Sequence, residues 1–159
     1  MAVTVLCVGK LRERFYAEAV LEYQKRLTRL MPVTVVELPD EREPENPSLA
    51  LQEQVMRREG ERILSKINSA DYVIALCVEA KQPTSRELAQ KLQDLFVQGK
   101  SQVVFVIGGS LGLAPEVVKR ANESMSMSRM TFPHQLARVI LMEQLFRAGK
   151  INAGERYHK

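Results

Sequence analysis

Val103–Leu113 has the sequence VVFVIGGSLGL, an apolar β-branched run followed by a loop that holds three glycines. A short continuous apolar run of this kind is typical of a strand buried on both faces of a parallel sheet. Ligands of open α/β sheets bind beyond the carboxyl ends of such strands, where glycines let backbone amides approach them closely. The stretch therefore predicts a central strand over 103–107. Two interpretations of the loop stay open: a plain strand-to-helix turn and a ligand-binding loop.

Similar apolar runs recur along the chain and alternate with helical patterns. The other candidate strands are Val3–Val8, Val33–Leu38, Tyr72–Val78 and Met127–Phe132. Helices are expected where apolar residues recur at three- and four-residue steps, as they do over 15–30 and 51–67. A third helix is expected over 84–99, which opens with the capping box Thr84-Ser85-Arg86-Glu87. A short helix is expected from Pro115, and a last one over Pro133–Ala148 with Gly149 as its stop. This alternation predicts one α/β domain over 1–159, with a mostly parallel sheet of five or six strands and helices on both faces.

The composition is that of an ordinary globular domain. The chain has 159 residues, of which 45% are hydrophobic and 26% charged, and a formal net charge of +4. No apolar run approaches the ~18 residues of a membrane helix, and the N-terminus lacks the basic region of a secretory signal. We therefore expect a cytoplasmic protein that uses no membrane and whose charge permits an anionic partner such as RNA. The few cysteines and histidines share no ligand spacing, so no metal site is expected: Cys7, Cys77, His134 and His158.

The last predicted helix is apolar over nearly its whole circumference. Its apolar positions are Leu136, Ala137, Val139, Ile140, Leu141, Met142, Leu145 and Phe146. A helix of this kind must be buried on more than one side, and in so small a domain one of those sides is expected to be another subunit. Arg138, Glu143 and Arg147 interrupt the apolar surface and need partners. Glu143 and Arg147 have the spacing of a helical ion pair, but Arg147 facing a phosphate or the substrate remains an alternative.

Two further stretches carry side chains suited to chemistry. Residues 127–134, Met-Ser-Arg-Met-Thr-Phe-Pro-His, fit either an edge strand with a helix cap or a loop whose backbone holds a flat, uncharged ring. His134 suits a cap or core position better than a catalytic base. The chain ends in Gly154-Glu155-Arg156-Tyr157-His158-Lys159. Chain ends usually fray, yet here a tyrosine that can stack on a base, a histidine that can move a proton and cations that can meet phosphate lie together.

Together these segments resemble the bacterial ribosomal large subunit pseudouridine N3-methyltransferases of the SPOUT class, from the first strand to the last residue. The resemblance is carried by Val8-Gly9-Lys10, Val106–Leu113, Met130-Thr131-Phe132-Pro133-His134, Glu143–Ala148 and Tyr157-His158-Lys159. It implies a SPOUT-type α/β trefoil knot, S-adenosylmethionine as methyl donor and a homodimer. The implied substrate is a modified uridine in a stem-loop of 23S rRNA, within the assembled ribosome.

The resemblance also assigns the site residues. It places the cofactor against Leu76, Gly108, Met127, Ser128, Arg129, Met130, Thr131 and Phe132. It gives catalytic and substrate roles to Arg147, Tyr157, His158 and Lys159, with Glu143 in support. Because the imide proton of pseudouridine N3 must leave before or during methyl transfer, His158 is the expected proton acceptor. Arg147 or Lys159 would stabilise the uridine anion, and Tyr157 would shape or stack the pocket.

Three other functions remain open. A non-enzymatic RNA- or ribosome-binding factor with the same fold would share the basic charge but would not need the glycine loop or the Tyr-His-Lys ending. A nucleotide-binding oxidoreductase is disfavoured, because no Gly-x-Gly-x-x-Gly and no ribose-binding acid follow the first strand. A SPOUT methyltransferase acting on tRNA is the third. The absence of an appended RNA-binding domain favours the ribosomal substrate, by resemblance.

Overall fold

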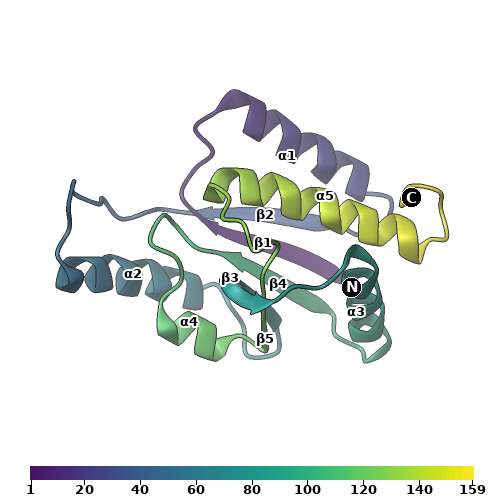
Figure 1. Ribbon diagram of the computed structural model, residues 1–159. Helices are drawn as coiled ribbons and strands as arrows, with labels where there is room; N and C mark the ends of the chain where they lie inside the picture. The colour runs from purple at the N-terminus through teal and green to yellow at the C-terminus, as the bar shows by residue number, and fades with distance from the viewer.

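The computed structural model describes residues 1–159 as a parallel sheet between two layers of helices (Figure 1). The strands are β1 (Ala2–Val8), β2 (Val33–Leu38), β3 (Tyr72–Lys81), β4 (Gln102–Ile107) and β5 (Glu123–Met125). They lie in the order β2-β1-β4-β3-β5, and every neighbouring pair is parallel. The helices are α1 (Arg14–Leu27), α2 (Leu49–Leu64), α3 (Ser85–Val97), α4 (Pro115–Arg120) and α5 (His134–Asn152). The expected α/β class, with a parallel sheet of five strands, is confirmed.

The two central strands explain why their sequences are apolar without interruption. Val3, Val5 and Cys7 of β1 pack into a large core with α1, α3 and α5, whereas Leu6 and Val8 pack into a smaller core with α2 and α4. β4 divides its side chains between the same two cores. Successive residues of a strand point to opposite faces, so both faces of β1 and β4 are buried, and all carboxyl ends of the strands meet at one edge.

Helix α5 lies between α1 and α3 on one face of the sheet (Figure 1). Its side chains Leu141, Met142, Leu145, Phe146 and Ala148 are buried in the large core. Most of its apolar circumference is therefore covered within a single chain. Leu136 and Ile140 are only half-buried and lie outside both cores, so the surface left for another subunit is a strip rather than a whole side.

The strand expected over Met127–Phe132 is wrong. The fifth strand is Glu123–Met125, which pairs with β3 at the edge of the sheet, and residues 127–132 form a loop. Serine hydroxyls compete there with strand pairing: Ser126 Oγ donates to the Ser128 carbonyl at 2.9 Å, and Ser128 Oγ accepts from the Met130 N–H at 3.0 Å. These short-range bonds bend the backbone away from the sheet.

Gly149 does not stop α5, which continues to Asn152. A Cβ at this position would lie 3.1 Å from Cβ of Leu30, in the turn that follows α1. Glycine is needed at position 149 because α5 and the turn after α1 approach closely there. This contact joins segments far apart in the chain, so the local sequence does not predict it. The capping box at the start of α3 and the proline at the start of α4 are both confirmed.

Candidate functional site

A cavity of about 640 Å³ lies at the carboxyl ends of β3 and β4. Three segments line it: Leu76–Val78 at the end of the regular pairing of β3, Ile107–Gly112 after β4, and the chain from Ser126 to the first turns of α5. We call it the cofactor cavity, because the predicted cofactor residues come together in it. Those that line it are Leu76, Gly108, Met127, Ser128, Met130, Thr131 and Phe132. Arg129 is exposed and does not line it.

The glycine loop forms one wall of this cavity and is tightly turned. Gly112 has a φ of +87° and donates its N–H to the Gly109 carbonyl at 3.1 Å. A Cβ on Gly108 would come within 2.8 Å of the Gly112 backbone. Glycine is thus required at both positions, by close approach at Gly108 and by the left-handed conformation at Gly112. Because the loop lines a cavity, the interpretation as a ligand-binding loop is favoured over that of a plain turn.

A buried carboxylate supports the loop from behind. Glu59 of α2 is 5% exposed, and a Cβ on Gly109 would lie 3.1 Å from its Oε1. Its Oε2 accepts the Glu41 N–H at 3.0 Å. Burial raises the pKa of Glu59. Glu59 was not singled out from the sequence, although its spacing of four residues from both Val55 and Ile63 places it on the buried face of α2, where a glutamate is unusual.

The lining of the cofactor cavity suits a flat, largely apolar group. Half of the lining residues are hydrophobic, and the rest are mainly glycines and small hydroxyl residues. Cys77 and His134 are the only titratable side chains among them. Burial, followed by the charge of Arg138, lowers the pKa of His134, so this imidazole stays neutral at neutral pH. The lining of this cavity therefore includes no lysine or arginine.

The C-terminal tail is folded onto α5 and does not fray. Arg147 Nη2 donates to Glu143 Oε1 at 2.6 Å, and the Tyr157 hydroxyl donates to the same oxygen at 3.2 Å. Arg147 Nη1 lies 3.3 Å from Nδ1 of His158. The Tyr157 ring packs edge-on against Phe146, with centroids 4.9 Å apart, and the Arg147 guanidinium lies 4.8 Å from the centre of the Tyr157 ring. These contacts define a tail cluster of Glu143, Arg147, Tyr157 and His158.

Four of the five predicted catalytic residues are thus brought together, while Lys159 is exposed and makes no side-chain hydrogen bond or ion pair. The expected Glu143–Arg147 ion pair is present. Hydrogen bonding to Glu143 raises the pKa of Arg147, and burial, followed by the charge of Glu143, raises the pKa of Tyr157. The cluster therefore presents a permanent cation and a neutral phenol at physiological pH.

The tail cluster and the cofactor cavity lie at opposite ends of α5. His134 and Ala137, in its first turns, line the cavity, whereas Glu143 and Arg147 are in its second half. Ala137 and Arg147 are separated by about 15 Å along the helix at 1.5 Å per residue. Within one chain, the cavity and the tail cluster are therefore two separate groups of residues.

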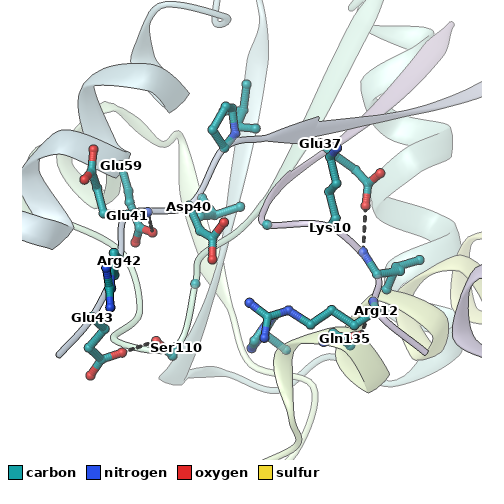
Figure 2. Close-up of a pocket in the computed structure, with 17 residues that line it drawn as sticks. Lys10, Arg12, Glu37, Asp40, Glu41, Arg42, Glu43, Glu59, Ser110 and Gln135 are labelled. Carbon is teal, nitrogen blue, oxygen red and sulfur yellow. Dashed lines mark hydrogen bonds between the residues drawn. The ribbon is translucent and has the colours of Figure 1, made fainter. Parts of the chain in front are cut away.

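A second and larger cavity, of about 910 Å³, adjoins the first (Figure 2). The two share Gly109, Ser110 and His134 as common lining. The other walls are the end of β1 with the segment after it (Val8–Arg12) and the end of β2 with the segment after it (Glu37–Glu43), together with Glu59 of α2 and Gln135 of α5. We call it the adjoining cavity. In the sequence, Val8-Gly9-Lys10 stands out only as part of a resemblance. The polar, proline-rich segment 39–47 after β2 is typical of an exposed connecting loop, and a substrate-facing flap is its less favoured interpretation.

No group of three or more histidine, cysteine, aspartate or glutamate side chains is placed to hold a metal ion, and none of the helices has the length and hydropathy needed to cross a bilayer.

Comparison with known proteins gives close relatives over the whole chain. A family model described as "Predicted SPOUT methyltransferase" matches residues 1–158. The protein named ribosomal RNA large subunit methyltransferase H is 51% identical over 159 residues in Bifidobacterium adolescentis and 52% identical over 159 residues in Bacillus cereus, with 100% of both chains covered in each case.

Solved structures show the same fold at low sequence identity. A probable methylase family protein from Haemophilus influenzae has a TM-score of 0.56 at 14% identity, over 99% of this chain and 70% of that one. The TrmH/SpoU tRNA modifying enzyme of A. aeolicus has a TM-score of 0.52 at 13% identity, over 96% and 77%. At these identities the likeness concerns the fold alone.

Proposed function

The chain belongs to the SPOUT methyltransferase family, and from this premise we propose that it methylates N3 of a pseudouridine in a stem-loop of 23S rRNA. The methyl donor is S-adenosylmethionine, and the substrate is the assembled ribosome in the cytoplasm. The names of relatives that are 51% and 52% identical over their full length support an rRNA substrate. The observation that carries the proposal is the pairing of a preformed glycine-loop cavity with an ordered tail cluster.

The cofactor cavity fits the proposed donor. Its walls combine apolar side chains with the tightly turned backbone around Gly108 and the bent loop 127–132. Such walls can hold a flat purine ring by apolar contact and by backbone hydrogen bonds. Leu76, Gly108, Met127, Ser128, Met130, Thr131 and Phe132 would hold it, while Arg129 would act from outside the lining. When bound, S-adenosylmethionine supplies a methyl group that its sulfonium has already activated.

The residues of the chain must then align the base, exclude water and remove a proton. We assign proton removal from N3 to His158, whose Nδ1 lies next to Arg147. The Arg147 guanidinium, held by Glu143, stabilises the anion that forms on the uracil ring. Tyr157, fixed against Phe146, offers a rigid face for the base, and Lys159 adds a second cation.

The site is complete only in a homodimer. Because the two halves lie about 15 Å apart on one α5, the tail cluster of one subunit must serve the cofactor cavity of the other. An antiparallel two-fold contact between α5 helices brings the first half of one helix to the second half of its partner. Apolar side chains that are not fully buried support such a contact. Leu136 and Ile140 on α5 are half-buried, and Val78 and Met130 at the cavity rim are 63% and 70% exposed.

The activity is tested by mass spectrometry of rRNA from cells with and without the gene. We expect the loss of a single methyl group on one pseudouridine of 23S rRNA, and its return when purified protein and S-adenosylmethionine are added to complete ribosomes. A methyl group lost from tRNA instead would establish a tRNA substrate. Failure of the purified protein to bind S-adenosylmethionine in calorimetry would point to a non-enzymatic factor.

The shared site is tested by mixing two inactive variants. His158→Ala removes the proposed base, and Thr131→Trp fills the cofactor cavity from an exposed position. Each pure variant should be inactive, and calorimetry should show cofactor binding by the first only. Random mixing should restore about a quarter of the wild-type rate, because half of the dimers then hold one intact site. An unrestored mixture that has formed heterodimers would overturn the two-chain site.

A further inference from the structure

The adjoining cavity has no role in the mechanism above, although it opens directly onto the cofactor cavity. Its lining holds five acids (Glu37, Asp40, Glu41, Glu43 and Glu59) and three cations (Lys10, Arg12 and Arg42). By residue type alone, the lining carries more acids than cations. The hydrogen bonds show which of these groups are free to bind a ligand.

Four of the acids are engaged by the protein. Glu37 accepts from buried Arg138 at 2.6 Å and from the Leu11 N–H at 3.0 Å. Glu41 is paired with Arg62 and lies 3.9 Å from Arg58. These three arginines do not line the cavity, so they compensate its acids from outside.

The other two engaged acids, Glu43 and Glu59, accept hydrogen bonds from uncharged donors in the glycine loop and in the segment after β2. Glu43 accepts from Ser110 Oγ at 2.6 Å, and Glu59 accepts from the Glu41 N–H. Asp40 alone among the five has a side chain without a hydrogen bond or ion pair. Four of the carboxylates therefore connect the walls of the cavity, and only the Asp40 carboxylate is free to bind a ligand.

The three cations of the lining are in the opposite situation. The side chains of Lys10, Arg12 and Arg42 make no hydrogen bond or ion pair, and all three are exposed. Figure 2 shows the Arg12 guanidinium extending into the space between α5 and the segment after β2, on which Asp40 lies. Guanidinium and ammonium groups with free N–H donors are suited to phosphate oxygens.

The free groups match the two kinds of polar group in a ribonucleotide. Phosphate oxygens only accept hydrogen bonds and need the cations, whereas ribose hydroxyls and base N–H groups can donate to the free carboxylate of Asp40. A volume of about 910 Å³ has room for a nucleotide together with part of the adjacent strand. Through Gly109, Ser110 and His134 the bound strand would contact the wall of the cofactor cavity.

We propose that the adjoining cavity is a subsite for the substrate RNA, in which Lys10, Arg12 and Arg42 bind phosphates of the strand next to the cofactor cavity. This inference rests on the proposed rRNA methyltransferase activity and adds the place where the substrate strand lies. The three side chains are positioning residues, because they hold the strand and take no part in the proton or methyl transfer.

The test is steady-state methylation of ribosomes by Lys10→Gln, Arg12→Gln and Arg42→Gln variants. Each should raise the KM for ribosomes about five- to tenfold with little change in kcat, and should lower the slope of log affinity against log salt by about one. Affinity for S-adenosylmethionine in calorimetry should not change. Since the three side chains are exposed and unpartnered, the variants should fold normally.

Lys100→Gln is the matched control. Lys100 is also exposed and free of ion pairs, and it precedes β4 at the other end of the sheet. It changes the net charge equally and should leave KM and the salt slope at wild-type values. Unchanged KM in all three cavity variants, or an equal rise in the Lys100 variant, would overturn the subsite. A wild-type enzyme that methylates no 23S pseudouridine would instead refute the proposed function.

Discussion

At the scale of single residues, the buried guanidinium of Arg138 fixes the position of the segments around the adjoining cavity. Arg138 is completely buried, yet it donates to Glu37 at 2.6 Å and to the Gly9 carbonyl at 3.1 Å, while its Nε has no partner. These bonds tie the start of α5 to the ends of β1 and β2. They thereby set the wall of the adjoining cavity.

We expect Arg138→Met to destabilise the protein by about 2–3 kcal/mol. Breaking a buried ion pair is costly, but Glu37 is 37% exposed and can regain water, which places the loss below that of a fully buried pair. Urea unfolding at a fixed chain concentration measures the difference. The double variant Glu37→Gln/Arg138→Met should lose no more than the single one, and a much larger loss would show that Arg138 acts through packing rather than through Glu37.

His134 makes the stability depend on pH. Its pKa is lowered from 6.5 by burial and by the charge of Arg138, so the unfolded chain takes up a proton more readily than the folded one. Stability should therefore be fully retained above about pH 6.5 and should decrease as the pH falls towards the folded-state pKa. In His134→Gln this part of the decrease should vanish between pH 7 and 5. Equal slopes for the two proteins in urea titrations would contradict the assignment.

At the scale of the elements, α5 shows how one helix serves two ends of a site. It fits between α1 and α3 because Gly149 allows Leu30 to approach closely. The buried length of the helix then holds the cofactor cavity at its first turns and the tail cluster in its second half. The same rigid packing keeps these two sites apart within one chain.

Gly149→Leu should destabilise the protein by about 1–3 kcal/mol, because the added side chain overpacks the contact with Leu30 in the turn after α1. The better helix propensity of leucine offsets this by less than ~1 kcal/mol. Thermal unfolding measures the net change. Adding Leu30→Ala should recover part of the loss, and if it adds its full cost instead, the two residues are not in conflict.

Several elements are predictable from local sequence because short-range chemistry sets them. The capping box of Thr84 and Glu87 starts α3 and Pro115 starts α4, as their positions indicate. The strand placed over Met127–Phe132 fails for the converse reason. Alternation of polar and apolar residues does not show that Ser126 and Ser128 bond to nearby backbone groups, nor that β3 offers pairing only to Glu123–Met125.

At the scale of the whole molecule, the active unit that we propose consists of two chains. The cofactor cavity has no lysine or arginine in its lining, whereas the tail cluster holds the Arg147 guanidinium in the second half of α5. In the two-chain site proposed above, one small domain supplies both halves of the chemistry and a second copy unites them. The half-buried strip of Leu136 and Ile140 is the surface expected to be covered.

Ile140→Glu should dissociate the dimer, because it places a charge in the centre of the proposed contact. We expect monomers in sedimentation velocity, a folded circular dichroism spectrum and at least a hundredfold loss of methylation. Val97→Glu is the control, since Val97 is 74% exposed at the end of α3 and should leave the dimer intact. A dimeric and fully active Ile140→Glu enzyme would refute this contact.

The sequence by itself determined the order of most strands and helices, the glycine loop and the family, since these depend on residues close together in the chain. Tertiary structure alone decided that Arg138 pairs with Glu37, that Gly149 lies inside a helix and that the adjoining cavity keeps free cations while four of its five acids are engaged. Each of these depends on groups brought together from distant parts of the chain. Local pattern carries no information about such neighbours, because burial and pairing arise only when the layers pack.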